Sequence, residues 1–241
     1  MDTRSFKLRY TNCFLLPHAE GWLLIDTGYD WEWDAFARGL ARFSVGPRDV
    51  SHLLLTHAHD DHAGLLNRMV AANPTLSVVM SDKSPAILKG GSNSTDGKGG
   101  YITRRMRFLA GLKAAFDKGW TRTFPPYETR SADRLIHGPI PLHDLGIDLA
   151  GTIYPTPGHT DDSISLVMDD GVCYCGDAAA NFFRFAGTRK CVIYMRDLDE
   201  YYESWDKLLE AGAKVMHPSH GGPFAASELT RERGRHVRLF A

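Results

Sequence analysis

The chain has 241 residues, of which 43% are hydrophobic, and its 28 basic and 29 acidic residues leave a formal net charge of −1. A chain of this length and composition can bury a sizeable core as one domain. The near-neutral balance gives no electrostatic reason to expect binding to nucleic acid or to an anionic membrane. There is no apolar run of membrane-spanning length and no leader with a charged start and an apolar core. We therefore expect a cytoplasmic protein with no membrane partner.

The first predicted elements are a β-hairpin and a helix. Short apolar runs at residues 14–16 and 22–25 are typical of two paired strands. Apolar residues then recur at helical spacing from 33 to 41, with Arg38 off the apolar stripe. This pattern predicts an amphipathic helix that packs against the hairpin.

The next predicted strand ends in a dense cluster of polar residues. The apolar run Leu53-Leu54-Leu55 predicts a buried strand that ends at Thr56, and His57-Ala58-His59-Asp60-Asp61-His62 follows it directly. Because His57 and His59 are two residues apart on extended backbone, they can point the same way. Asp61 and His62 lie where the chain turns into a helix, so they can face a second, neighbouring ion. Neutral imidazole and carboxylate groups are ligands of zinc and similar divalent ions. We predict a metal site here with two ions, and we expect Asp60 to point outward as a charged surface residue.

An irregular segment from about 81 to 143 follows a second predicted helix, which runs from Leu65 to its stop at Asn73-Pro74. Residues 89–100 are rich in Gly, Ser, Asn and Lys, which is typical of a mobile loop. Apolar residues then recur at roughly helical spacing between Ile102 and Phe116. The segment is predicted to be an insertion in a single domain that covers residues 1–241.

The second half of the chain repeats the order strand, strand, helix. Residues 163–168 and 172–175 flank Asp169-Asp170-Gly171, a turn sequence typical of a hairpin. Residues 198–209 have the spacing of an amphipathic helix. Two such halves predict an α/β (α+β) fold, an αββα sandwich with the metals at one edge where the loops converge.

The four cysteines, at positions 13, 173, 175 and 191, are too few and too irregularly spaced for a disulfide framework in a chain of this length. We expect them to be small buried side chains. Cys173-Tyr174-Cys175 reads as part of a strand and not as half of a thiolate metal site, because no second thiol pair accompanies it.

The motif His57-x-His59-x-Asp61-His62 resembles the signature of the metallo-β-lactamase superfamily. Further motifs resemble those of the family in the same order, from about Asn12 to Gly221; they are Ile25-Asp26-Thr27-Gly28, Pro157-Gly158-His159-Thr160, Gly176-Asp177 and His220-Gly221. The resemblance implies the metallo-β-lactamase fold. It also implies that one ion is held by His57, His59 and His159, that the other is held by Asp61, His62 and His220, and that Asp177 bridges them.

Two of these assignments leave an alternative open. His217 lies three residues before His220, and we prefer His220 because the His-Gly pair matches the family. Asp26 is expected to hydrogen-bond a ligand histidine and so fix the orientation of its ring. Its alternative is a plain strand-ending turn with Gly28. Asp161 and Asp162 are expected to organise the turn after His159.

The implied chemistry is hydrolysis by a hydroxide that bridges two divalent ions. Asp61 is the expected catalytic residue, which orients this nucleophile and passes its proton. Zinc suits the histidine and carboxylate ligands best, and iron and manganese also accept them. The predicted substrate is a small-molecule ester, lactone or thioester. The first alternative is a metal-dependent phosphodiesterase, followed by a redox enzyme and by a non-catalytic binding scaffold.

This sequence differs from the patterns of known subfamilies at several points, and these differences reduce the range of expected substrates. Only 21 residues follow His220, too few for the C-terminal region by which glyoxalase II relatives bind the glutathione thioester. Many quorum-quenching lactonases carry a tyrosine three positions after the bridging Asp, where Ala180 stands here. In relatives, an insertion such as 81–143 often forms a wall or lid of the substrate cleft. An exposed helical hairpin or a homodimer contact is the equal alternative for this segment.

Overall fold

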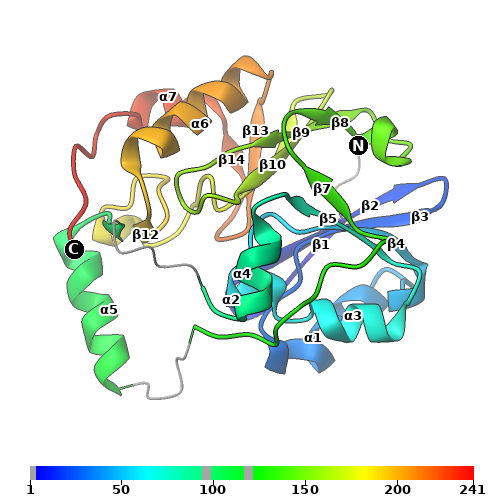
Figure 1. Ribbon diagram of the computed structural model, residues 1–241. Coiled ribbons are helices and arrows are strands. Elements are labelled where there is room, and N and C mark those ends of the chain that lie inside the picture. Colours follow the sequence, from blue (N-terminus) through cyan, green and yellow to red (C-terminus); the bar gives the residue numbers. More distant parts are fainter. Residues whose placement is uncertain (1–3, 94–98, 117–121) are drawn as a thin grey trace.

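The computed structural model describes residues 4–93, 99–116 and 122–241, with side chains described as far as residue 112 in the helix that ends at Phe116. Two six-stranded sheets pack face to face, and helices cover their outer faces (Figure 1). The αββα sandwich that the sequence predicts is therefore confirmed. No helix within the described residues is long and apolar enough to cross a membrane.

The first sheet has the strand order β1-β2-β3-β4-β5-β7. Its strands are β1 (Arg4–Lys7), β2 (Asn12–His18), β3 (Gly21–Ile25), β4 (Val50–Leu54), β5 (Ser77–Ser81) and β7 (Arg134–Ile136). The predicted hairpin is the antiparallel pair β2–β3, whereas β3, β4, β5 and β7 run parallel. The associated helices are α1 (Trp33–Ala41), α2 (Asp60–Ala63), α3 (Leu66–Ala72) and α4 (Ser84–Gly90).

The second sheet has the strand order β14-β13-β11-β10-β9-β8. Its strands are β8 (Ile140–Pro141), β9 (Gly151–Pro155), β10 (Ile164–Met168), β11 (Val172–Gly176), β13 (Val215–Pro218) and β14 (Phe224–Ala225). The predicted second hairpin is the antiparallel pair β10–β11, and β11 runs parallel to β13. The helices α6 (Leu198–Glu210) and α7 (Ser227–Glu232) lie on the outer side of this sheet (Figure 1).

Three apolar layers hold the sandwich together. In the central layer, side chains such as Leu16 and Ile25 of the first sheet meet Ile153 and Leu166 of the second. The outer face of the first sheet packs against α1 and α3, and the outer face of the second sheet packs against α6. Because both faces of each sheet are covered, the central strands carry nearly continuous apolar runs.

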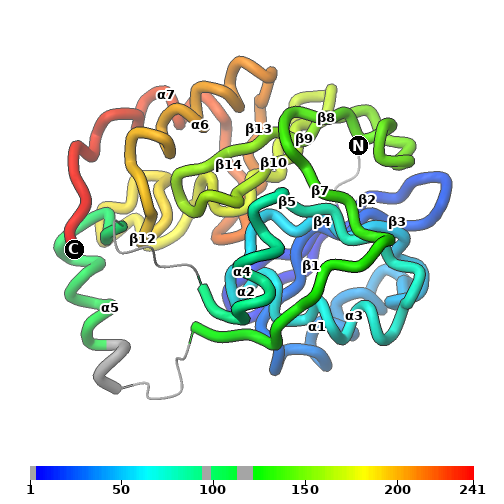
Figure 2. The backbone as a smooth tube through the Cα atoms, in the orientation of Figure 1, coloured from blue at the N-terminus to red at the C-terminus, as the bar shows by residue number. Residues whose placement is uncertain are grey.

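The segment 81–143 only partly matches its prediction. Lys89 and Gly90 end α4, Gly100 begins the short strand β6 (Gly100–Tyr101), and residues 94–98 lie outside the described part of the chain. The predicted helix is α5 (Arg104–Phe116), and β6 pairs with β12 (Tyr194–Met195) of the second half. Figure 2 shows how this green segment reaches across to the yellow and red part of the chain. The remaining short elements are the 3-10 helices η1 (Asp30–Glu32), η2 (Pro47–Asp49), η3 (Leu142–Leu145) and η4 (Arg184–Ala186).

Candidate metal centre

Most of the candidate ligands follow the carboxyl ends of parallel strands, whereas His159 follows the antiparallel strand β9. His57 lies just beyond β4, which pairs in parallel with β3, and Asp26 lies just beyond β3. In the second sheet, Asp177 follows β11 and His220 lies just beyond the parallel strand β13. Because the carboxyl ends of parallel strands meet at one edge of a sheet, residues far apart in the sequence converge there.

The first group of candidate ligands consists of His57, His59 and His159, whose ligand atoms lie within 4.8 Å of one another. The Nε2 atom of His159 lies 3.1 Å from Nδ1 of His59. The other ring nitrogen of His159 donates to the carbonyl oxygen of Tyr194 at 2.9 Å, which leaves Nε2 directed at the group. The structure thus brings together the three histidines that the sequence assigns to one ion.

The second group consists of Asp61, His62 and His220. Nε2 of His220 lies 3.3 Å from Oδ2 of Asp61, and Nε2 of His62 lies 3.6 Å from Oδ1 of the same carboxylate. The Nδ1 atom of His220 lies 3.0 Å from the carbonyl oxygen of Tyr10 and donates to it. These contacts hold the three side chains with their ligand atoms facing a common point.

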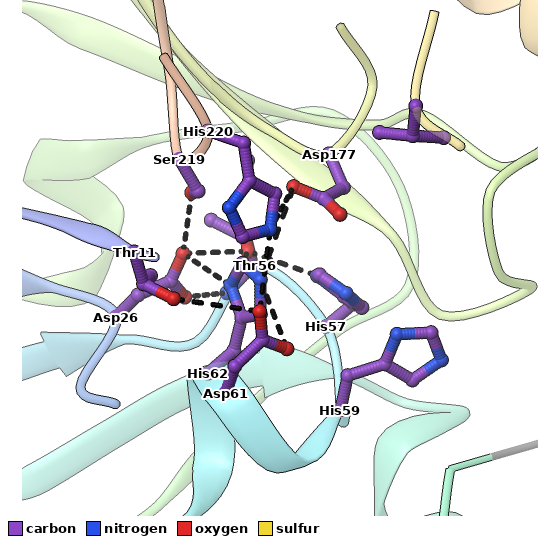
Figure 3. A network of polar contacts seen from close by, with 12 residues as sticks. Thr11, Asp26, Thr56, His57, His59, Asp61, His62, Asp177, Ser219 and His220 are labelled. Atoms are coloured by element: carbon purple, nitrogen blue, oxygen red, sulfur yellow. Dashed lines mark hydrogen bonds and ion pairs between the residues drawn. The ribbon is translucent and has the colours of Figure 1, made fainter. Parts of the chain in front are cut away.

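Asp177 lies between the two groups. Its Oδ1 is 3.3 Å from Nε2 of His220, and its Oδ2 is 3.4 Å from Nε2 of His159. Figure 3 shows this carboxylate beside the ring of His220, opposite Asp61. One oxygen therefore faces each group, an arrangement that would allow this carboxylate to contact an ion in each.

Several buried polar atoms at this centre lack a hydrogen-bond partner within the described part of the chain. They are Nε2 of His57, Nε2 of His59, Nε2 of His62 and Oδ1 of Asp177. An unsatisfied buried polar atom costs about 1–3 kcal/mol, so several of them on neighbouring residues call for an explanation. Divalent cations are the natural partners of imidazole nitrogens and carboxylate oxygens, and the donor set fits such ions.

Asp26 anchors a buried network behind the second group (Figure 3). Its Oδ2 accepts hydrogen bonds from Nδ1 of His62 at 2.8 Å, from Oγ of Ser219 at 3.0 Å and from Oγ1 of Thr56 at 2.9 Å. Its Oδ1 accepts from the backbone N–H of Thr56 at 2.9 Å. The carboxylate thus fixes the proton of His62 on Nδ1 and leaves Nε2 for the centre.

The buried charges of the centre shift one another's pKa values. Burial, together with His159, lowers the pKa of His59 to about 3, so this ring is neutral and ready to bind a cation. Burial alone would raise the pKa of Asp177, but His220 and the other histidines outweigh it and lower the pKa to about 2. Burial also opposes a charge on His62, yet Asp61 and Asp26 raise its pKa to about 9.

Asp60 contradicts the sequence prediction. We expected it to point outward, but it is only 7% exposed. Its backbone N–H donates to Oδ1 of Asn93 at 2.8 Å, and its Oδ1 accepts from Nδ2 of Asn93 at 2.8 Å. The segment after α4 therefore closes over the metal motif and supplies the amide that allows this carboxylate to be buried.

Asp162 does more than organise the turn after His159. Its Oδ2 accepts from the backbone N–H of Ala58 at 2.9 Å and from Oγ of Ser84 at 2.7 Å. This buried carboxylate ties the His57–His59 loop to the start of α4, and burial raises its pKa. Asp161 instead forms an ion pair with Arg196 at 2.7 Å.

The structure also bears on the alternative ligand His217 and on the four cysteines. His217 packs its ring against Phe14 and Tyr174. It belongs neither to the two ligand groups above nor to the further set of His57, His62 and Asp177, whose ligand atoms also lie close together among the described residues. All four cysteines are buried, and burial raises the pKa of each thiol.

The sequence analysis did not identify Thr11 as a residue of the site. Its Oγ1 lies 3.4 Å from Oδ2 of Asp61. No local pattern around Thr11 signals that contact.

A cleft of about 270 Å³ opens onto the candidate ligands. That volume is near the lower end of the range for small-molecule pockets. Its walls are mainly apolar and include six aromatic side chains: Tyr10, Tyr29, Tyr101, Phe182, Phe183 and Tyr194. Met106, Leu109 and Ala110 of α5 also line it, so the insertion forms one wall of the cleft.

Comparisons with known proteins bear on the fold and the family. A family model described as the metallo-beta-lactamase superfamily matches residues 7–220. Metallo-beta-lactamase domain-containing protein 1 of Xenopus laevis is 42% identical over 202 residues, which cover 84% of this chain and 67% of that protein. The Bacillus subtilis protein named "Probable metallo-hydrolase YqjP" is 26% identical over 83% of this chain and 63% of its own length. The chain thus spans about two thirds or less of the length of these relatives.

Solved structures show the same fold. A metallo-beta-lactamase family protein from Thermus thermophilus superposes with a TM-score of 0.62 at 20% identity, over 97% of this chain and 78% of that one. An archaeal metallo-beta-lactamase superfamily protein from Sulfolobus tokodaii gives a TM-score of 0.59 at 18% identity, over 94% and 80%.

Proposed function

The chain belongs to the metallo-β-lactamase superfamily, and on that premise we propose that it is a dinuclear metal-dependent hydrolase of a small ester, lactone or thioester. The observation that carries the proposal is the position of Asp177, with one carboxylate oxygen facing each group of candidate ligands. Zinc is the metal that the donor set suits best, and iron and manganese accept the same donors.

The proposed ligands are those that the structure brings together. His57, His59 and His159 would hold one ion; Asp61, His62 and His220 would hold the other; and Asp177 would contact both. When bound, such ions lower the pKa of a coordinated water and polarise the scissile carbonyl.

The protein's contribution is to orient these donors before any ion binds. The Nδ1 atom of each of three histidines has an acceptor of its own: Asp26 for His62, the Tyr194 carbonyl for His159 and the Tyr10 carbonyl for His220. Each ring is thereby held with its Nδ1–H group turned away from the centre and Nε2 turned toward it. Little reorganisation is then needed when the ions and the substrate bind.

Asp61 is the proposed catalytic residue. Burial opposes its charge, but His62 and His220 outweigh this effect and hold the pKa of Asp61 well below its usual range, so the carboxylate is ionised at neutral pH. Its Oδ2 lies 3.3 Å from Nε2 of His220 and accepts from Oγ1 of Thr11 at 3.4 Å. In this position the ionised Asp61 can orient an attacking water by accepting a hydrogen bond from it.

The cleft supports a small-molecule substrate. Its volume of about 270 Å³ and its mainly apolar walls suit an acyl or aryl group better than a polymer. Burial raises the pKa of every cysteine thiol, which disfavours catalysis by a thiolate.

The test is hydrolysis of a panel of aryl esters, lactones, thioesters, phosphodiesters and a β-lactam, by protein with measured metal content, before and after treatment with a chelator. We expect turnover of one acyl class that the chelator abolishes and added zinc restores. Cleavage of phosphodiesters alone would replace the proposal with the phosphodiesterase alternative. Turnover that survives complete metal removal would refute a metal-dependent hydrolase.

The number of ions is tested separately by Asp177→Ala. Loss of the carboxylate between the two groups should lower the bound metal from about two equivalents toward one or none and reduce turnover by at least about a hundredfold. Asp169→Ala, at an exposed position in the β10–β11 turn, is the matched control and should retain both. Unchanged metal content in Asp177→Ala would contradict the two-metal arrangement.

A further inference from the structure

Arg122 is the single arginine or lysine among the described residues that line the cleft. The rest of that lining consists of candidate metal ligands, apolar and aromatic side chains, and the hydrogen-bonded Asp60 and Asn93. A guanidinium in an apolar cleft is a strong recognition element for oxyanions, because it offers planar, paired N–H donors where water competes little.

The backbone around Arg122 is tied to the metal motif. Its carbonyl oxygen accepts from the backbone N–H of Asn93 at 3.0 Å, and the side chain of Asn93 pairs with Asp60, the neighbour of Asp61. Next to this contact, Ser92 and Thr123 form an antiparallel bridge. Arg122 thus enters the cleft from a short paired segment that is joined through Asn93 to the loop carrying the proposed ligands.

The side chain also reaches the opposite part of the insertion. Nη2 of Arg122 donates to the hydroxyl oxygen of Tyr101 at 3.4 Å. Tyr101 belongs to β6, and its ring meets that of Tyr194 edge to face at a centroid distance of 5.3 Å. The guanidinium therefore contacts the hydroxyl end of Tyr101, an aromatic side chain of the cleft wall.

From this arrangement, and building on the proposed hydrolase function, we propose that the substrate carries a carboxylate at the end of an apolar body, and that Arg122 binds this carboxylate. The apolar body would lie along Met106, Leu109 and the aromatic walls, with the scissile group at the proposed ligands. Arg122 would then determine specificity without taking part in the chemical step.

The experiment compares two esters of equal chain length, para-nitrophenyl hexanoate and the mono-para-nitrophenyl ester of adipic acid, which differ by the terminal carboxylate. We expect Arg122→Met to lower kcat/KM for the adipate ester by about tenfold to a hundredfold, the range for loss of a charge-assisted hydrogen bond. The hexanoate ester should change by less than about twofold, because it makes no such bond. Arg122→Lys should restore part of the adipate activity, since it keeps the charge and loses the paired donors.

A binding measurement separates failure of this inference from failure of the proposed function. If neither ester is cleaved, calorimetry with the metal-loaded protein still compares phenylbutyrate with phenylbutanol. We expect Arg122→Met to lower the affinity for phenylbutyrate by a similar factor and to leave the affinity for phenylbutanol unchanged. Any carboxylate contact with metal is common to both proteins, so it cancels in this comparison. An equal effect of Arg122→Met on the acidic and the neutral member of each pair, or no effect on either, would overturn the proposal.

Discussion

Asp26→Asn is the sharpest test of how the second ligand group is organised. The substitution keeps the size of the side chain but can replace Oδ2 with an NH₂ group, which donates where the carboxylate accepted. Nδ1 of His62, Oγ of Ser219 and Oγ1 of Thr56 all converge on Oδ2, at distances of 2.8 to 3.0 Å. The hydroxyl groups can rotate and accept instead, but the N–H of His62 cannot.

The expected result is that His62 gives up its Nδ1 proton and keeps the one on Nε2, the nitrogen that the metal needs. Loss of such a ring partner typically weakens metal binding by about 10- to 100-fold. A buried charged hydrogen bond is also lost, which should lower the free energy of unfolding by about 1.5–3 kcal/mol. Asp26→Ala would be a poorer test, because it leaves four buried donors without an acceptor and favours unfolding.

Zinc affinity is measured by competition with a chromophoric chelator, and stability by urea unfolding of the same preparations. Asp169→Asn changes an exposed aspartate in the β10–β11 turn in the same way and is the control. Asp26→Asn with wild-type zinc affinity would refute the inference that Asp26 sets the tautomer of His62. If Asp26→Asn bound zinc as tightly as the wild type but unfolded at lower urea concentration, Asp26 would have only a structural role in the turn that ends β3, the alternative given by the sequence.

Three further predictions follow from the buried groups. Burial opposes a proton on His62 and on His220, but Asp61 and Asp26 raise the pKa of His62 to about 9, and Asp177 and Asp61 raise the pKa of His220; zinc binding should release these protons, and affinity should rise by at least about tenfold per pH unit toward pH 9, which titrations in several buffers would measure. The four cysteines are buried with raised pKa values, so a thiol reagent should label none in the folded protein and all four in urea; rapid labelling of the folded form would contradict their burial. Asn93→Ala leaves the buried Asp60 without its amide partner and should lower the free energy of unfolding by about 1–3 kcal/mol with zinc content retained; an unchanged urea midpoint would show that the pair contributes nothing.

The parts of this protein that the sequence predicts best are those encoded by short-range patterns. Alternating and continuous apolar runs identify the β2–β3 and β10–β11 hairpins, and helical spacing identifies α1 and α6. The candidate ligands could be named because each lies in a short motif next to a strand end. Parallel pairing places the ends of β3 and β4, and those of β11 and β13, at one edge. His159 instead follows β9, which pairs antiparallel with its neighbours.

Long-range polar contacts were not predictable in the same way. Thr11 and Asp61 are 50 positions apart, and Asp60 and Asn93 are 33 apart. An aspartate at the start of a helix is usually exposed, so outward-pointing Asp60 was the reasonable expectation. Only the structure shows that Asn93, in the Gly- and Ser-rich segment, lies beside the metal motif and pairs its side-chain amide with Asp60. The composition of residues 89–100 predicted a loop, but it contained no information about which residues the loop contacts.

The contact between Asp60 and Asn93 has a consequence for how specificity could change. The proposed metal ligands are positioned by strand ends and by buried partners such as Asp26. The cleft wall that contains Arg122 belongs to the insertion, and it contacts the metal motif through Asn93. Substitutions in the insertion can therefore alter the wall while the ligand geometry stays intact. The same metal chemistry can then act on different substrates, since loops positioned by a rigid scaffold tolerate change better than the scaffold does.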